Sequence, residues 1–142
     1  MTLANSLGLT RTRDRLRLFV GFVQATQYVV SREGGLADSI ERFGVQMPVE
    51  TLVSHQGDCD SCSLLLLTLL RAAGFVQAGL MLVESADSGH AMVVVRMEPV
   101  AGDYVVSAKD ARFIPVECTG EFPIGYCDAV YIGRSVRAVA LG

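Results

Sequence analysis

Gly57-Asp58-Cys59-Asp60 leads directly into residues 61–73, SCSLLLLTLLRAA, and this stretch decides the fold. Asp58 is a favoured residue for the cap of a helix N-terminus, and Asp60 adds a negative charge that suits the first turn. The helix is expected to run from Cys59 to about Ala73, with Gly74 as its stop. Because apolar side chains nearly encircle it, we expect this helix to be central and buried.

The same stretch places a thiol, Cys59, at the opening of a buried helix. There the thiol meets unpaired backbone N–H groups and the positive end of the helix dipole, and both favour the thiolate. The thiolate is the nucleophilic form of cysteine. The sequence therefore predicts that Cys59 is a nucleophile, with Asp58 and Asp60 as the residues that support the helix start.

Composition narrows the class of protein. The chain has 142 residues, and we expect one domain over residues 1–142, with residues 1–10 loose. A net charge of −3 does not favour nucleic acid or an anionic membrane surface as a partner. No apolar run reaches the roughly 18 residues that a membrane span requires. The first residues lack the pattern of a signal peptide, so we expect a cytoplasmic location with reduced thiols. The sequence makes no prediction of oligomeric state.

Helices dominate the first half of the chain and strands the second. A helix is expected over residues 10–30, where apolar residues recur at helical spacing, and a short one over residues 48–52. Arginines 11, 13, 15 and 17 are interpreted as a solvated helix face. After Gly74, strands are expected over residues 78–84, 90–97, 103–106, 113–118, 130–132 and 136–141. This order predicts an α+β fold with an antiparallel sheet.

A nucleophilic thiol needs a base and a group that orients the base. His90 is the best candidate base, because it stands at the mouth of a strong strand from which it can reach a helix N-terminus; His55 lies in the loop before Cys59. Glu117 stands in an otherwise apolar strand, where a carboxylate needs a partner. Asp103 and Asp110 are weaker candidates because turns are expected around them. The sequence therefore predicts Cys59, His90 and Glu117 as a triad.

These segments resemble those of transglutaminase-like domains. Residues 57–74 are similar to the family's nucleophile helix, with its pattern G-D-C, apolar positions and L-x-x-L-L-R-x-x-G. Gly89-His90-Ala91 is similar to the histidine strand and residues 116–120 to the acid strand, in which Asp is commoner than Glu. Residues 48–52 also resemble the segment that often precedes the cysteine. The likeness covers roughly residues 20–126, and Cys, His and acid follow in the family's order.

The resemblance implies a papain-like fold, in which a helix that carries the cysteine packs on an antiparallel sheet that carries His and acid. It implies acyl transfer or hydrolysis at an amide through a thioester on Cys59, with a peptide or small amide as substrate and with neither cofactor nor metal. The calcium-binding regions of animal transglutaminases are not in this sequence, so hydrolysis is expected. One oxyanion donor would be the Cys59 backbone N–H. The second is expected from the first helix, where the candidates are Gln24, Gln27 and Tyr28.

Other interpretations of the same residues stay open. Cys59 and Cys62 form a C-x-x-C pair that is also typical of redox proteins, and the four cysteines together could bind zinc. The simplest role for Cys62, Cys118 and Cys127 is that of small buried apolar residues. Glu117 could pair with an arginine such as Arg96 or Arg112. A catalytically silent interaction module on the same fold is a further alternative.

Overall fold

The computed structural model describes residues 11–30, 45–84, 89–108 and 110–139. Helix α4 (Cys59–Ala72) lies at the centre of the described part, as predicted. Its buried residues include Leu65, Leu66, Leu67 and Leu70, and Gly74 follows it with a φ of +87°. A left-handed conformation of this kind suits glycine, so the predicted stop of the helix is confirmed. No helix among these residues is long and apolar enough to cross a membrane.

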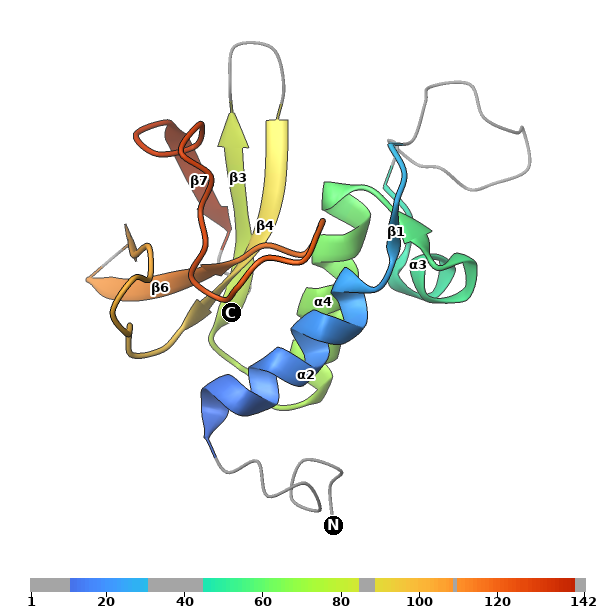
Figure 1. Cartoon of the computed structure of the whole chain (residues 1–142), viewed down its shortest axis with the longest axis horizontal. Coiled ribbons are helices and arrows are strands. Elements are labelled where there is room, and N and C mark those ends of the chain that lie inside the picture. The colour runs from blue at the N-terminus through green and yellow to red at the C-terminus, as the bar shows by residue number, and fades with distance from the viewer. Residues whose placement is uncertain (1–10, 31–44, 85–88, 109, 140–142) are drawn as a thin grey trace.

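Two further helices accompany α4. Helix α2 (Thr12–Gln24) buries Leu16, Val20 and Val23, which recur at helical spacing. Helix α3 (Pro48–Ser54) begins with proline at its first turn, as predicted, and is capped at its C-terminus by His55, which has a φ of +54°. In Figure 1 these helices lie to one side of the main sheet, with α2 alongside α4.

The main sheet is antiparallel and has the strand order β5-β6-β4-β3-β7. A second, parallel pair joins β1 to β2. The strands have these bounds: β1 Gln27–Tyr28, β2 Gln56–Gly57, β3 Ala78–Glu84, β4 Gly89–Arg96, β5 Val106–Ala108, β6 Ala111–Val116 and β7 Ser135–Val139. Helices in the first half and an antiparallel sheet in the second confirm the predicted α+β class.

The two faces of the sheet carry separate cores. Val93 and Val95 of β4 pack with the leucines of α4 and the apolar side of α2. Met92 and Val94, which alternate with them, pack with Met81 and Val83 of β3 on the opposite face. The pairing of β4 with β6 ends at Val93 opposite Val116, so the ladder is open beyond that point. The candidate site forms at this open end.

Three predicted elements differ from the structure. The first helix ends at Gln24 and not at residue 30, because Gln27 N donates to His55 O and Val29 N to Gly57 O as the chain joins β2. Of residues 103–106 only Val106 is in a strand; Asp103 instead closes a turn on Val100. Residues 130–132 form turns and not a strand, and residues 140–141 of the last predicted strand lie outside the described residues.

The interpretation of the α2 arginines as a solvated face was wrong for Arg13 and Arg15, whereas Arg11 and Arg17 are exposed. Arg13 makes a two-pronged ion pair with Asp103, at 2.8 and 2.6 Å, and donates to Ile124 O. The Arg13 side chain is 17% exposed and that of Asp103 is 4% exposed. Arg15 donates to Ala73 O and lies over the ring of Phe75. These contacts attach α2 to the end of α4 and to the loop before β5.

Candidate active site

The start of α4 is built by the side chain of Asp58. Its Oδ1 accepts hydrogen bonds from Ser61 N at 3.0 Å and from Ser61 Oγ at 2.7 Å. This is the geometry of an N-terminal cap, which satisfies backbone donors that the helix leaves unpaired. Asp60 lies exposed in the first turn. Both residues therefore support the helix start as the sequence predicts, and Cys59 is the first helical residue.

His90 and Glu117 meet at the open end of the β4–β6 ladder. His90 is the second residue of β4, and Glu117 directly follows β6. His90 Nε2 and Glu117 Oε2 are 2.6 Å apart, and their side chains are 12% and 6% exposed. Since a carboxylate can only accept, the imidazole donates in this bond. The alternative pairing of Glu117 with an arginine is therefore wrong; Arg112 pairs with Glu98 instead.

The second carboxylate oxygen of Glu117 is also fully engaged. Oε1 accepts from Cys118 N at 2.9 Å, Thr119 N at 3.0 Å and Thr119 Oγ1 at 2.7 Å. Burial by itself raises the pKa of Glu117, but the hydrogen bonds and charge of His90 and the bonds from Thr119 outweigh it, so the pKa lies below its usual value. Glu117 is thus held as a carboxylate in a fixed orientation.

His90 connects this carboxylate to the thiol. Because Nε2 faces Glu117, the other ring nitrogen, Nδ1, is left for Cys59, whose thiol is close enough to influence the pKa of His90 and also contacts Asp60 Oδ1 at 4.0 Å. Burial lowers the pKa of His90, but hydrogen bonds to Cys59 and Glu117 and the charges of both raise it to about 9. A raised pKa means that the site favours a proton on His90. The arrangement places a thiol beside an imidazole that a carboxylate orients, and these are the parts that activation of a cysteine requires.

The three oxyanion candidates lie in different surroundings. Gln24 Nε2 donates to Glu117 O at 3.0 Å and to Phe122 O at 2.8 Å, so both of its N–H groups hold the loop after β6. Gln27 is exposed, and its Oε1 accepts from Gln56. Tyr28 points to the opposite side of β1, and its pKa is raised first by partial burial and then by the charges of Cys59, Asp58 and Glu117. A phenol that keeps its proton can donate a hydrogen bond, which is what the predicted oxyanion role requires.

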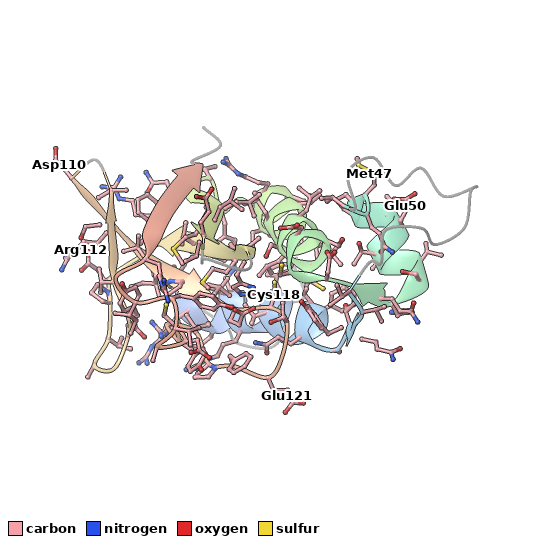
Figure 2. The ribbon with its side chains drawn as sticks, turned by 90° about the horizontal axis from the view of Figure 1, so that it is seen from above. Met47, Glu50, Asp110, Arg112, Cys118 and Glu121 are labelled. Carbon is pink, nitrogen blue, oxygen red and sulfur yellow. The ribbon has the colours of Figure 1, made fainter. Side chains whose placement is uncertain are left out.

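The remaining cysteines bear on the redox and zinc alternatives. Cys62 and Cys118 are buried, as expected for small apolar residues, whereas Cys127 is only partly buried. Burial, with the charge of Asp58, raises the pKa of Cys62 to about 11, so Cys62 stays a thiol. Figure 2 shows Cys118 near the middle of the molecule. Among the described residues, which include all four cysteines, no group of three or more His, Cys, Asp or Glu side chains could hold a metal ion, so the four cysteines are not placed as a zinc site.

The sequence does not indicate two residues that contact the site, Thr119 and Tyr131. Thr119 holds the carboxylate of Glu117, and its only signal is its place in the acid segment. Tyr131 stacks on His90 with ring centroids 4.8 Å apart and an angle of 4° between the planes. Residues 130–132 have the composition of a strand, and no local pattern indicates this contact between β4 and a distant turn.

The fold is shared by two solved structures of LapG from Legionella pneumophila. The calcium-bound form aligns with a TM-score of 0.60 at 18% identity, over 96% of this chain and 68% of LapG. The EGTA-treated form aligns with a TM-score of 0.61 at 17% identity, over 94% and 66%. No model of a protein family matches the sequence, and neither does any curated protein. At such identities the likeness shows the papain-like fold alone.

Proposed function

We propose that this chain is a transglutaminase-like cysteine enzyme that hydrolyses or transfers the acyl group of an amide. The observation that supports it most is the 2.6 Å bond of His90 to the buried carboxylate of Glu117, with the thiol of Cys59 close enough to raise the pKa of the same imidazole. A nucleophile, a base and a group that orients the base are the three parts that covalent catalysis by a thiol requires. The substrate proposed is a peptide or a small amide.

In the first half of the reaction, His90 takes the proton of the Cys59 thiol. The sulfur attacks the amide carbonyl, and the negative charge that forms on the carbonyl oxygen is stabilised by the Cys59 backbone N–H and the Tyr28 hydroxyl. His90 then returns the proton to the leaving nitrogen as the C–N bond breaks. The products of this half are a thioester on Cys59 and a free amine.

In the second half, His90 takes a proton from water while the water oxygen attacks the thioester carbonyl. The C–S bond breaks, the acid product leaves, and Cys59 regains its proton from His90. An amine in place of water gives acyl transfer. Glu117 keeps its charge throughout and holds the imidazole in the tautomer that presents Nδ1 to Cys59.

The calcium of the LapG structure is not carried into this proposal. Among the described residues, no group of three or more His, Cys, Asp or Glu side chains is placed to hold a metal ion. The part of the chain that the structure describes therefore does not form such a site, and no proposed step uses one. The cytoplasmic location expected from the sequence stays a proposal.

A peptide library incubated in ¹⁸O-labelled water tests the proposal. The wild type is expected to cleave library members and to leave ¹⁸O in the new carboxyl group, whereas methylamine added to the mixture would appear in the product if acyl transfer competes. Cys59→Ala should abolish cleavage. Cys62→Ala removes a buried thiol within the same helical turn and serves as the matched control. Cleavage that persists in Cys59→Ala would contradict the proposal.

A further inference from the structure

The ring of Tyr131 lies flat on the imidazole of His90, with centroids 4.8 Å apart and an angle of 4°. This is the arrangement of a stacked pair, which is worth more than the burial of its area alone. His90 is otherwise held by bonds in the plane of its ring, to Glu117 and to Cys59. The stack with Tyr131 therefore restrains His90 against movement out of the plane of its ring.

Tyr131 is itself fixed by its loop. Asp128 O accepts from Tyr131 N at 2.9 Å, and Asp128 Oδ1 accepts from Val130 N at 3.0 Å. Tyr131 O accepts from Arg134 N at 3.2 Å, which closes the next turn. The Tyr131 side chain also packs against the apolar cluster formed by Met81, Val83, Met92 and Val94. The ring is thus anchored both by its backbone and by the sheet, and it can restrain a neighbour.

The charges around His90 give the stack an electrostatic role. Cys59 and Asp60 face His90 from α4, and Glu117 faces it from the end of β6. All three favour an imidazolium, and the face of an aromatic ring attracts a cation. Burial raises the pKa of Tyr131, and the charges of Glu117, Asp128 and Cys59 raise it further, so its hydroxyl stays neutral. Tyr131 therefore contributes to holding the charge on His90 without adding a charge of its own.

We propose that Tyr131 is a positioning residue for His90. Its ring, anchored by the Asp128 turn, fixes the imidazole plane in line with Cys59 and Glu117 and keeps water off the bond between His90 and Glu117. Its effect on reaction rate rests on the proposed function, whereas the positioning itself is independent of turnover.

Proton NMR of the imidazole C–H signals during a pH titration tests the positioning. The chain has two histidines, and the exposed His55 provides an internal control in every sample. In Tyr131→Leu and Tyr131→Met, which both lack a ring, the His90 signals should lose the upfield shift caused by the stacked ring. Their titration midpoint should also move from about 9 toward the ordinary value of 6.5. His55 should not change.

Two further variants decide whether the ring is responsible. Tyr131→Phe keeps the ring and should restore both the shift and the midpoint of His90. Phe122→Leu removes another aromatic stack, between Phe122 and Tyr126 with centroids 4.6 Å apart, and should leave His90 unchanged. The proposal is overturned if both ring-free variants titrate like the wild type, or if Tyr131→Phe behaves as they do.

A second readout separates this proposal from the proposed function. The rate at which iodoacetamide alkylates Cys59 should fall about tenfold in Tyr131→Leu, as expected for the loss of a stacked pair, and recover in Tyr131→Phe. If wild-type Cys59 is no more reactive than the other thiols, the proposed function fails, while the His90 titration still decides the role of Tyr131. A normal Cys59 rate in both ring-free variants overturns the rate effect assigned to Tyr131.

Discussion

His90 Nε2 and Glu117 Oε2 lie 2.6 Å apart at the point where β4 and β6 cease to pair. This bond joins the start of β4 to the residue after β6, beyond the point where backbone hydrogen bonds pair the two strands. It also leaves Nδ1 of the imidazole facing the start of α4. The bond between His90 and Glu117 thus brings a base and a carboxylate together at the end of the sheet where β4 and β6 no longer pair, and this is the candidate catalytic site.

Glu117→Gln should inactivate the site without unfolding it. Cys118 N, Thr119 N and Thr119 Oγ1 all donate to one oxygen of Glu117, so in the variant they will select the oxygen of the new side-chain amide. The amide NH₂ then faces His90 Nε2 and donates to it, which moves the ring proton to Nδ1, toward Cys59. His90 can no longer accept the thiol proton.

The loss expected in Glu117→Gln is about 10²-fold or more in the alkylation rate of Cys59, since general base catalysis contributes on that scale. Alkylation kinetics followed by peptide mass spectrometry measure it. Glu98→Gln, which neutralises an exposed carboxylate paired with Arg112, is the control. An unchanged Cys59 rate in Glu117→Gln would remove Glu117 from the triad.

The His90 pair should make stability depend on pH in a defined direction. The pKa of His90 is raised in the folded state, to about 9 from 6.5, so its contribution to stability is complete below pH 6.5 and disappears as pH rises toward 9. The pKa of Glu117 is lowered, so its contribution is present above its usual value of 4.5 and disappears as pH falls through the folded pKa.

Urea unfolding at intervals between pH 6 and 9 measures the alkaline part of this dependence. The free energy of unfolding should decline over that range in the wild type and stay nearly level in His90→Gln. The thiol of buried Cys62 has a pKa of about 11 in the folded state, against about 9 when unfolded. Its ionisation therefore lowers the free energy of unfolding only above about pH 9, outside the range measured. The same slope in His90→Gln and in the wild type would show that His90 is not the group responsible.

The ion pair between Arg13 and Asp103 should matter for stability and not for chemistry. Removal of one partner from a buried pair leaves an uncompensated charge, which costs about 3 kcal/mol. Arg13→Met should therefore lower the free energy of unfolding by about that amount. Arg17→Met removes an exposed pair with Asp14 and should cost less than about 1 kcal/mol. Equal losses in the two variants, measured by urea unfolding, would contradict the difference in burial.

Local signals in the sequence predicted much of the site. A capping aspartate, an apolar run and a terminal glycine are properties of neighbouring residues, and they placed Cys59 at the start of α4. Apolar runs placed His90 at the mouth of one strand and Glu117 within another, although β6 ends at Val116, one residue before Glu117. The order of cysteine, histidine and acid then made a triad a natural expectation.

Contacts between distant segments were not predictable in this way. Arg13 and Asp103 are 90 positions apart, and a pattern of alternating arginines on a helix does not reveal a buried partner. The turn at Asp128 breaks a stretch that has the composition of a strand, because its carboxylate takes Val130 N. That turn also places Tyr131 on His90, so an error in one element concealed a residue of the site.

Alkylation of all four cysteines by iodoacetamide, compared between the wild type and His90→Gln, tests the central claim most directly. Peptide mass spectrometry gives a rate for each thiol. We predict that Cys59 reacts at least about tenfold faster than Cys62, Cys118 and Cys127 in the wild type, and that this advantage is lost in His90→Gln. Equal rates at the four thiols, or a Cys59 rate that does not depend on His90, would contradict the assignment of Cys59 as an activated nucleophile.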